Sequence, residues 1–278
     1  MEPLIVTVAA VGAEFTREEQ PNLPISPEDL ALDAAACAEA GASIYHLHVR
    51  DAEGRPTMDV ETFRAAHAAI TSATDLIVQF TTGGSVSDEA PARLAPLQLR
   101  PEMATLTTGS VNFGSEVFVN AAPFVQELYE TMRDLGVLPE FEIFEAGMIA
   151  NAARLVKDGG YPDHLHFDLV LGVPGAIPAW PDAVSFLSSH LPEGASWTAT
   201  GIGRRWLEVA ETSIELGGHV RTGFEDVLHS SPGVLALSNS HLVAEVVDLA
   251  RTEGRPVATP SQAREILGLL KSAGQAVT

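Results

Sequence analysis

Eight short apolar runs recur along the chain, and each is followed by a segment whose apolar residues repeat with helical spacing. The runs predict strands at residues 4–9, 43–49, 76–80, 103–106, 140–144, 166–171, 197–200 and 219–222. The segments between and after them predict helices at residues 27–40, 60–72, 87–97, 123–135, 151–158, 181–189, 205–216, 241–253 and 260–270. Strand–helix alternation through eight units predicts an α/β fold, the (β/α)8 TIM barrel.

Length and composition agree with a single barrel domain over residues 1–278. The chain has 278 residues with 46% hydrophobic content, which suits one large core of the barrel size class, ~250 residues. A doubly wound parallel sheet is the alternative fold, but no glycine-rich dinucleotide loop follows the first predicted strand. No repeat, linker or low-complexity stretch indicates a second domain.

Charge and cysteine content exclude several classes of function. The formal net charge is −21, from 16 basic and 37 acidic residues, and phosphate binding needs a basic surface. We therefore expect no nucleic-acid partner. The single cysteine, Cys37, excludes a disulfide framework and a thiolate zinc site. Because the chain shows no secretory leader and no 18-residue apolar run, we expect a cytoplasmic protein with no membrane partner.

Two histidines stand two residues apart near the end of the second predicted strand, at His46 and His48. Side chains alternate faces along a strand, so both imidazoles project from the same face. Such a pair at the carboxyl end of a barrel strand predicts a divalent-metal site, with zinc favoured. The alternative is two unrelated histidines, one of them in the core.

Polar residues also follow other predicted strands at the same end of the barrel. Glu14 follows the first strand and Thr82 the third, while Arg221, Glu225 and Asp226 lie at the end of the eighth. Each has a structural alternative: a solvated loop charge for Glu14, a glycine-rich loop around Thr82, and a surface ion pair for Arg221.

A second pair of histidines, His164 and His166, is the rival metal site. It stands at the start of the sixth predicted strand, so we expect it at the opposite end of the barrel. His219 and Asp75 come before strands rather than after them, and we assign both to the structural face as well.

Motifs from five predicted units, in chain order, resemble those of the β-keto acid cleavage enzyme family. They are Gly12-Ala13-Glu14, residues 40–51 with the two histidines, Thr82-Gly83-Gly84, residues 108–113, and residues 217–226. The resemblance runs nearly end to end, finishing with residues 257–260 and 266–269.

The resemblance implies a zinc-dependent barrel that condenses a β-keto acid with acetyl-CoA to give acetoacetate and a new CoA ester. It implies that His46, His48 and Glu225 bind zinc, and that the protein is a homo-oligomer, a tetramer. The catalytic residues that it implies are Glu14, Arg221, Asp226, a hydroxyl after the third strand, assigned to Thr82, and a further hydroxyl, Thr107 or Thr108. Threonine at position 82 replaces an expected serine, which keeps the hydroxyl and adds a methyl group.

These residue types suit that chemistry. A metal held by two imidazoles and one carboxylate keeps positions open for a keto acid, and Arg221 beside Asp226 can polarise a hydroxyl or a water for proton removal. We expect Arg204 and Arg205, after the seventh strand, to meet the anionic CoA. The alternatives are a metal-dependent hydrolase or aldolase on the same barrel, and a metal-binding barrel without activity.

Overall fold

The computed structural model describes residues 2–269, and its centre is a closed barrel of eight parallel strands. The strands, in their order around the barrel, are β1 (Val6–Ala9), β12 (His219–Thr222), β11 (Ser196–Gly201), β10 (His166–Leu171), β9 (Leu138–Ile143), β6 (Met103–Thr107), β5 (Ile77–Phe80) and β2 (Ile44–Leu47). Pairing of β1 with β12 closes the ring. The predicted (β/α)8 barrel is confirmed.

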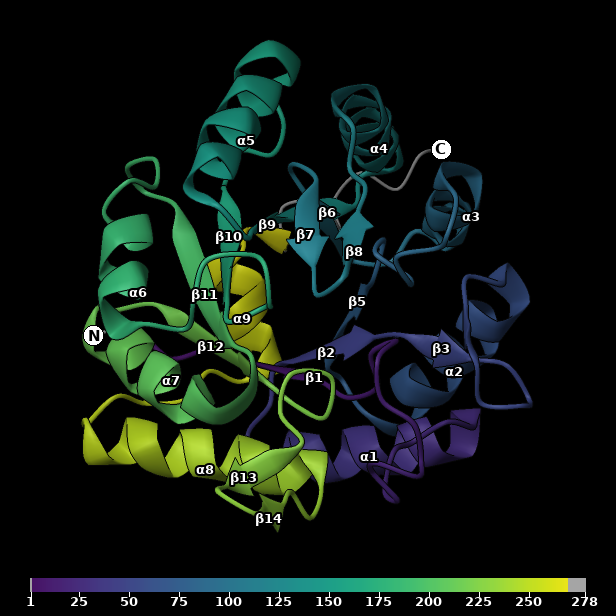
Figure 1. Ribbon diagram of the computed structural model, residues 1–278, viewed down its shortest axis with the longest axis vertical. Helices are drawn as coiled ribbons and strands as arrows, with labels where there is room; N and C mark the ends of the chain where they lie inside the picture. Colours follow the sequence, from purple (N-terminus) through teal and green to yellow (C-terminus); the bar gives the residue numbers. More distant parts are fainter. Residues whose placement is uncertain (1, 270–278) are drawn as a thin grey trace.

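Helices surround the strands on the outside of the barrel (Figure 1). They are α1 (Pro27–Ala40), α2 (Val60–Ala73), α3 (Ala90–Leu94), α4 (Ala122–Leu135), α5 (Ala146–Gly159), α6 (Pro181–Ser188), α7 (Trp206–Glu215), α8 (Asn239–Thr252) and α9 (Pro260–Ile266), with 3-10 turns at Ala95–Leu99 and Gly203–Arg205. No helix among residues 2–269 is long and apolar enough to cross a membrane.

Two helices differ from their predicted ranges for local reasons. The segment predicted as 87–97 is broken into α3 and a 3-10 turn, where Pro96 cannot supply the N–H that an α-helix needs. Helix α5 begins at Ala146, five residues before the predicted start, because burial of Met148 and Ile149 outweighs the weak helix propensity of Gly147. The part of the last predicted helix at residue 270 lies outside the described residues.

Three short hairpins were not predicted, and all decorate loops outside the barrel. They pair β3 (Val49–Arg50) with β4 (Pro56–Thr57), β7 (Val111–Phe113) with β8 (Glu116–Phe118), and β13 (His229–Ser231) with β14 (Val234–Leu235). The predicted strand at 43–49 is consequently divided, because the barrel strand ends at Leu47 and Val49 pairs outward with β4.

An apolar layer closes the barrel at the amino ends of its strands. Ile5, Ile44, Ile77 and Met103 pack there with Leu267, which follows α9. Helix α9 lies across the ring of strands in Figure 1. This floor leaves the carboxyl ends of the strands as the open end of the barrel.

Candidate active site

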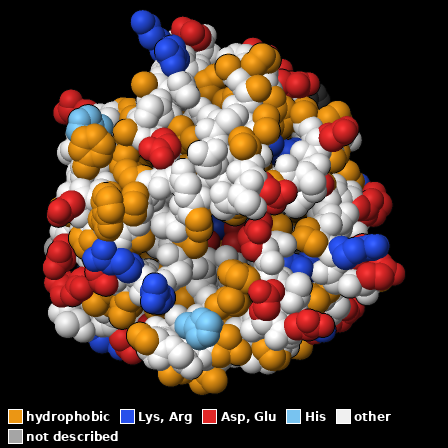
Figure 2. Space-filling model, in the orientation of Figure 1, with side chains coloured by type: hydrophobic (Ala, Val, Ile, Leu, Met, Phe, Trp, Pro, Cys, Tyr) orange, Lys and Arg blue, Asp and Glu red, His pale blue; other side chains and the backbone are white. Residues whose placement is uncertain are grey.

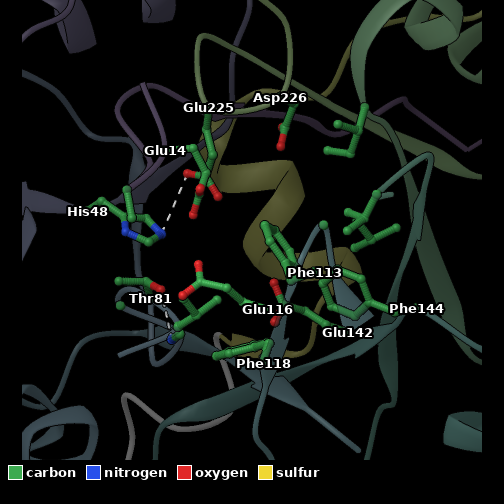
Figure 3. A pocket seen from close by; sticks show the side chains of 18 of the residues that line it. Glu14, His48, Thr81, Phe113, Glu116, Phe118, Glu142, Phe144, Glu225 and Asp226 are labelled. Carbon is green, nitrogen blue, oxygen red and sulfur yellow. Dashed lines mark hydrogen bonds and ion pairs between the residues drawn. The ribbon is translucent and has the colours of Figure 1, made fainter. Parts of the chain in front are cut away.

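Three potential metal ligands meet at the open end of the barrel. His46 and His48 come from the end of β2, and Glu225 comes from the turn after β12. Nε2 of His46 lies 3.7 Å from Oε1 of Glu225, and Nε2 of His48 lies 3.6 Å from Oε2. The ligand atoms all lie within 4.8 Å of one another, and Figure 3 shows His48 and Glu225 facing each other. The donor set of two imidazoles and one carboxylate fits a divalent metal such as zinc.

The protonation states of the histidines favour metal binding. Burial lowers the pKa of His46 to about 3 and also lowers the pKa of His48, so both rings are neutral at neutral pH. Nδ1 of His46 lies 2.6 Å from Oε1 of Gln79, and an amide oxygen can only accept a hydrogen bond. The hydrogen of His46 is therefore on Nδ1, and the lone pair of Nε2 points toward Glu225. Sequence reasoning missed Gln79, although it lies inward on β5, the next strand.

Arg221 joins Glu225 to Asp226 in a buried ion-pair network. Its Nε and Nη2 donate to the two carboxylate oxygens of Asp226, each at 3.0 Å, and Nη2 also donates to Glu225 at 2.5 Å. Burial alone would lower the pKa of Arg221, but Asp226, Glu225 and Asp168 raise it well above its usual value. Arg221 is thus a permanent cation. Because the side chains of Arg221 and Asp226 are only 5% and 1% exposed, the predicted alternative of a surface ion pair is wrong.

Close packing around the turn that carries Glu225 requires glycine at two positions, Gly223 in the turn and Gly12 after β1. Gly223 has a φ of 144°, and a Cβ there would lie 2.2 Å from the carbonyl oxygen of Ala9. Gly12 has a φ of 61°, and a Cβ there would lie 2.6 Å from Cγ of Glu225. Asn239 at the start of α8 accepts a hydrogen bond from the backbone N–H of Phe224 at 2.8 Å and so holds the same turn. These contacts place Glu225 over β2, far away in sequence.

A cavity of about 530 Å³ opens beside this cluster. Figure 2 shows the hollow near the centre of the open face, with acidic side chains inside it. One part of its wall is charged and the other is apolar and aromatic. The residues from both parts that bear on chemistry are Glu14, His46, His48, Thr81, Phe113, Glu116, Phe118, Glu142, Phe144, Arg221, Glu225 and Asp226.

Two of the predicted catalytic residues, Glu14 and Thr82, differ in their position relative to the cavity. Glu14 lines the cavity and is about half-buried; burial first, and then the charges of Glu225 and Glu116, raise its pKa. Thr82 does not line the cavity, because its hydroxyl donates to the carbonyl oxygen of Thr105 at 2.7 Å. Thr81 lines the cavity instead and becomes the alternative to Thr82 for the predicted hydroxyl, whose assignment stays a prediction. Gln79 and Thr81 are two residues apart, so strand alternation directs both side chains to the same face, and this pattern could have identified Thr81 from the sequence.

The two threonines after the fourth barrel strand, β6, lie behind the cavity wall. Thr107 donates to Oε2 of Glu142 at 2.5 Å, and Thr108 donates to the backbone of Met148 at 3.0 Å. Thr107 thus acts on Glu142, which lines the cavity and which sequence reasoning did not select. Burial raises the pKa of Glu142 to about 7. The position of Glu142 near the end of a predicted strand was the sequence signal that could have identified it as a cavity residue.

Neither of the two predicted CoA-binding arginines lines the cavity. Arg204 is exposed, and Arg205 pairs with Glu208 one turn along the same segment. The 3-10 turn after β11 directs both side chains outward, although their backbone follows the correct end of the strand.

The rival histidines, His164 and His166, lie at the start of β10, apart from the metal-ligand group. His166 is buried inside the barrel, with Nε2 3.1 Å from Oε2 of Glu140 and Nδ1 2.8 Å from Oγ of Ser196. His164 contacts the same serine oxygen at 2.7 Å. His219 accepts a hydrogen bond from the backbone of Ile5 in the barrel floor. Among residues 2–269, only His46, His48 and Glu225 form a group with metal-ligand spacing.

Comparison with known proteins gives the family. A family model described as beta-keto acid cleavage enzyme matches residues 3–269. The chain belongs to the β-keto acid cleavage enzyme family. It is 46% identical over 273 residues to a 3-keto-5-aminohexanoate cleavage enzyme of Fusobacterium nucleatum, with 98% of this chain and 100% of the relative covered. It is 38% identical to the 3-oxoadipate:acetyl-CoA acetyltransferase of Cupriavidus necator, with 96% and 95% covered. The resemblance inferred from sequence motifs is confirmed.

Solved structures support the fold of this β-keto acid cleavage enzyme. The ternary complex of ObcA with a C4-CoA adduct and oxalate superposes with a TM-score of 0.75 at 20% identity, over 89% of this chain and 68% of that chain. The 3-dehydroquinate dehydratase from Aquifex aeolicus VF5 superposes with a TM-score of 0.53 at 12% identity, over 90% and 98%. At these identities the likeness concerns the barrel fold alone.

Proposed function

We propose that the protein is a zinc-dependent enzyme that exchanges acyl groups between a β-keto acid and acetyl-CoA. The bond between C2 and C3 of the keto acid breaks, the C3 acyl fragment joins the sulfur of CoA, and the C2 fragment joins the acetyl group. Acetoacetate and a new acyl-CoA result, and no water is consumed. Support comes from the family membership and from the acetyl-CoA transferase relative in Cupriavidus necator.

The observation that carries the proposal is the cluster of His46, His48 and Glu225 beside Arg221 in one cavity. A zinc ion held by these three ligands would supply a Lewis acid that polarises the keto group. Oε2 of Glu225 is buried and lacks a hydrogen-bond partner among the described residues. An unsatisfied carboxylate oxygen 3.6 Å from the neutral imidazole of His48 fits a bound cation.

Arg221 is positioned to bind the negative end of the substrate. Its Nη1 is buried without a hydrogen-bond partner in the described structure, 3.7 Å from Glu142 and 3.9 Å from Asp168. Since Asp226 holds the other guanidinium edge, Nη1 is free to donate to a carboxylate or to a developing enolate oxygen.

Removal of a proton from C2 needs a base within hydrogen-bond reach. Thr81 lines the cavity and accepts a hydrogen bond from the backbone N–H of Gly83 at 2.9 Å, so its own hydrogen is available. We assign the proton transfer to this hydroxyl, or to a water, oriented by Arg221 and Asp226. The guanidinium of Arg221, which lines the same cavity, would stabilise the oxyanion form.

The test is product formation with each substrate alone and with both. We expect acetoacetate only when a β-keto acid and acetyl-CoA are present together, and only in metal-loaded enzyme. Removal of the metal by a chelator should abolish the reaction, and added zinc should restore it. Cleavage of the keto acid at the same rate without acetyl-CoA would establish the hydrolase or aldolase alternative instead.

A further inference from the structure

A hydrogen-bonded cluster on the outer side of the barrel wall joins the two segments that supply the candidate metal ligands. Its members are Asp33 on α1, Tyr45 on β2 and Asn239 at the start of α8. Helices α1 and α8 contact each other and lie side by side in Figure 1. None of the three side chains lines the cavity, so the cluster is separate from the groups that would contact a substrate.

Asn239 is fully buried, and its amide connects the end of β1 with the turn after β12. Its Oδ1 accepts a hydrogen bond from the backbone N–H of Phe224 at 2.8 Å, and its Nδ2 donates to the carbonyl oxygen of Ala10 at 3.2 Å. Phe224 directly precedes Glu225, whose own N–H donates to the carbonyl oxygen of Ala9 at 3.1 Å. The amide therefore helps to fix the backbone that carries Glu225.

Asp33 fixes the direction in which that amide points. Nδ2 of Asn239 lies 3.1 Å from each carboxylate oxygen of Asp33 and donates to them. An ionised carboxylate can only accept hydrogen bonds, and a backbone N–H can only donate. An amide between Asp33 and the N–H of Phe224 consequently has one satisfactory orientation, with its nitrogen toward the carboxylate. The reverse orientation would leave polar groups on both sides without a partner.

The same carboxylate also holds the strand that carries the two histidines. The hydroxyl of Tyr45, which is fully buried, donates to Oδ2 of Asp33 at 2.9 Å. Side chains alternate along β2, so Tyr45 points outward to α1 while His46 points into the barrel. Asp33 is thus joined to both chain segments whose ligand atoms must meet at the metal.

This cluster acts on backbone, whereas the contacts inside the barrel act on side chains. Gln79 orients the ring of His46, and Arg221 contacts the carboxylate of Glu225. Zinc binds nitrogen and oxygen ligands at about 2.0–2.2 Å, so a small displacement of one segment against the other weakens binding even when each side chain keeps its own partner. The connection through Asp33 opposes that displacement.

We propose that Asp33 is a positioning residue that sets the affinity of the site for a divalent metal. It acts through Asn239 on the turn after β12 and through Tyr45 on β2. The inference rests on the proposed function, in which the two histidines and Glu225 hold zinc. Partners that orient metal ligands from outside the ligand set are worth ~10–100-fold in metal affinity.

The experiment measures the zinc dissociation constant of the metal-depleted, full-length protein at neutral pH, by competition with a chromophoric chelator. Asn239→Ala removes the connection to the turn and should raise the dissociation constant ~10–100-fold. Asp33→Asn keeps the size of the side chain and one acceptor oxygen; it should also weaken zinc binding, and it serves if Asn239→Ala does not fold. Tyr45→Phe should give a smaller rise, because β2 is also held by its pairing with β1 and β5.

A double variant tests whether Asp33 and Asn239 act along one path. Effects of independent groups on a binding free energy add, whereas effects of groups in one network do not. The dissociation constant of the combined Asp33→Asn and Asn239→Ala variant should therefore rise by less than the product of the two single rises. A rise equal to that product would show that Asp33 acts independently of Asn239, and the inference would be wrong.

The matched control is Tyr129→Phe, which removes a buried tyrosine hydroxyl on α4. The hydroxyl of Tyr129 donates to the carbonyl oxygen of Tyr161 at 2.6 Å, and Tyr129 does not line the cavity. We expect wild-type zinc affinity in this variant. Equal weakening in Tyr129→Phe and Tyr45→Phe would refute the role of the cluster, because any lost hydroxyl would then have the same effect.

The outcomes separate this inference from the proposed function. Wild-type zinc affinity in both Asn239→Ala and Asp33→Asn would refute the role of Asp33 while zinc binding stands. A wild-type protein that binds no zinc would refute that role together with the metal of the proposed function. Because no substrate is present, the measurement does not depend on whether the acyl exchange occurs.

Discussion

The paired guanidinium and carboxylate of Arg221 and Asp226 give the sharpest prediction. Asp226→Asn keeps the size of the side chain, removes one charge, and turns an amide donor toward a guanidinium that can only donate. The pair is bidentate, with both contacts at 3.0 Å, and the side chains are 5% and 1% exposed. The variant therefore leaves Arg221 with one good acceptor fewer in a site where both side chains are almost fully buried.

The size of the effect follows from that burial. Removing one partner of a buried ion pair costs about 3–5 kcal/mol. If the reacting geometry depends on the orientation of Arg221, this loss falls on the transition state, and each 1.36 kcal/mol is tenfold in rate. We expect kcat to fall ~10²–10⁴-fold with little change in KM, because a misoriented Arg221 loses contacts that the substrate makes with it in the transition state. Zinc should stay bound, since His46, His48 and Glu225 are unchanged.

The assay measures kcat and KM for the keto acid, zinc content by elemental analysis, and exchange of the C2 hydrogens with deuterated solvent in the absence of acetyl-CoA. Asp248→Asn is the control, because Asp248 pairs with Arg251 on the surface, where both side chains are more than 70% exposed. A surface pair is worth little, so this variant should match wild type. Wild-type exchange in zinc-loaded Asp226→Asn would refute the reasoning and leave Asp226 as a structural partner only.

Three further predictions concern the metal, the hydroxyl and stability. His46→Ala should lose most of the bound zinc while keeping the barrel fold by circular dichroism; full zinc in this variant would contradict the assignment. Thr81→Val should lower kcat with unchanged stability, whereas Thr82→Val should lower stability by about 1 kcal/mol with near-normal kcat, and a reversed result would restore Thr82. Burial raises the pKa of Asp33 from 3.8 to about 6, so its protonated form favours folding and that stability is lost as the pH rises through 6. Urea unfolding at pH 5 and 7.5 should show this pH dependence, about 1.4 kcal/mol over that interval, reduced in Asp33→Asn; equal pH dependence in both proteins would contradict it.

Several features of the site follow from local rules and were predictable from sequence. Side chains alternate along a strand, so His46 and His48 had to share a face once the run around them was recognised as a strand. The carboxyl ends of parallel strands meet at one end of a barrel, which gave Glu14, Arg221 and Asp226 a common location. The same rule placed His164 and His166 away from the metal ligands.

Other features of the site depend on which segments meet in space. Glu225 lies opposite His46 because β1 pairs with β12, and that closure joins residues from the two ends of the chain. Glu116 reaches the cavity on a hairpin too short to show a strand pattern, tied down by Pro174. The direction of Arg204 depends on a single 3-10 turn.

The sequence alone determined the order of the elements, the face of each strand and the end of the barrel that carries chemistry, because these depend on residues a few positions apart. The tertiary structure decided which carboxylates are paired with Arg221 and which, such as Glu14 and Glu116, form no ion pair within residues 2–269. It also decided that Thr81 rather than Thr82 faces the cavity. Burial, distance and pairing of charges are properties of packed neighbours, and packing brings together residues whose separation in sequence carries no pattern.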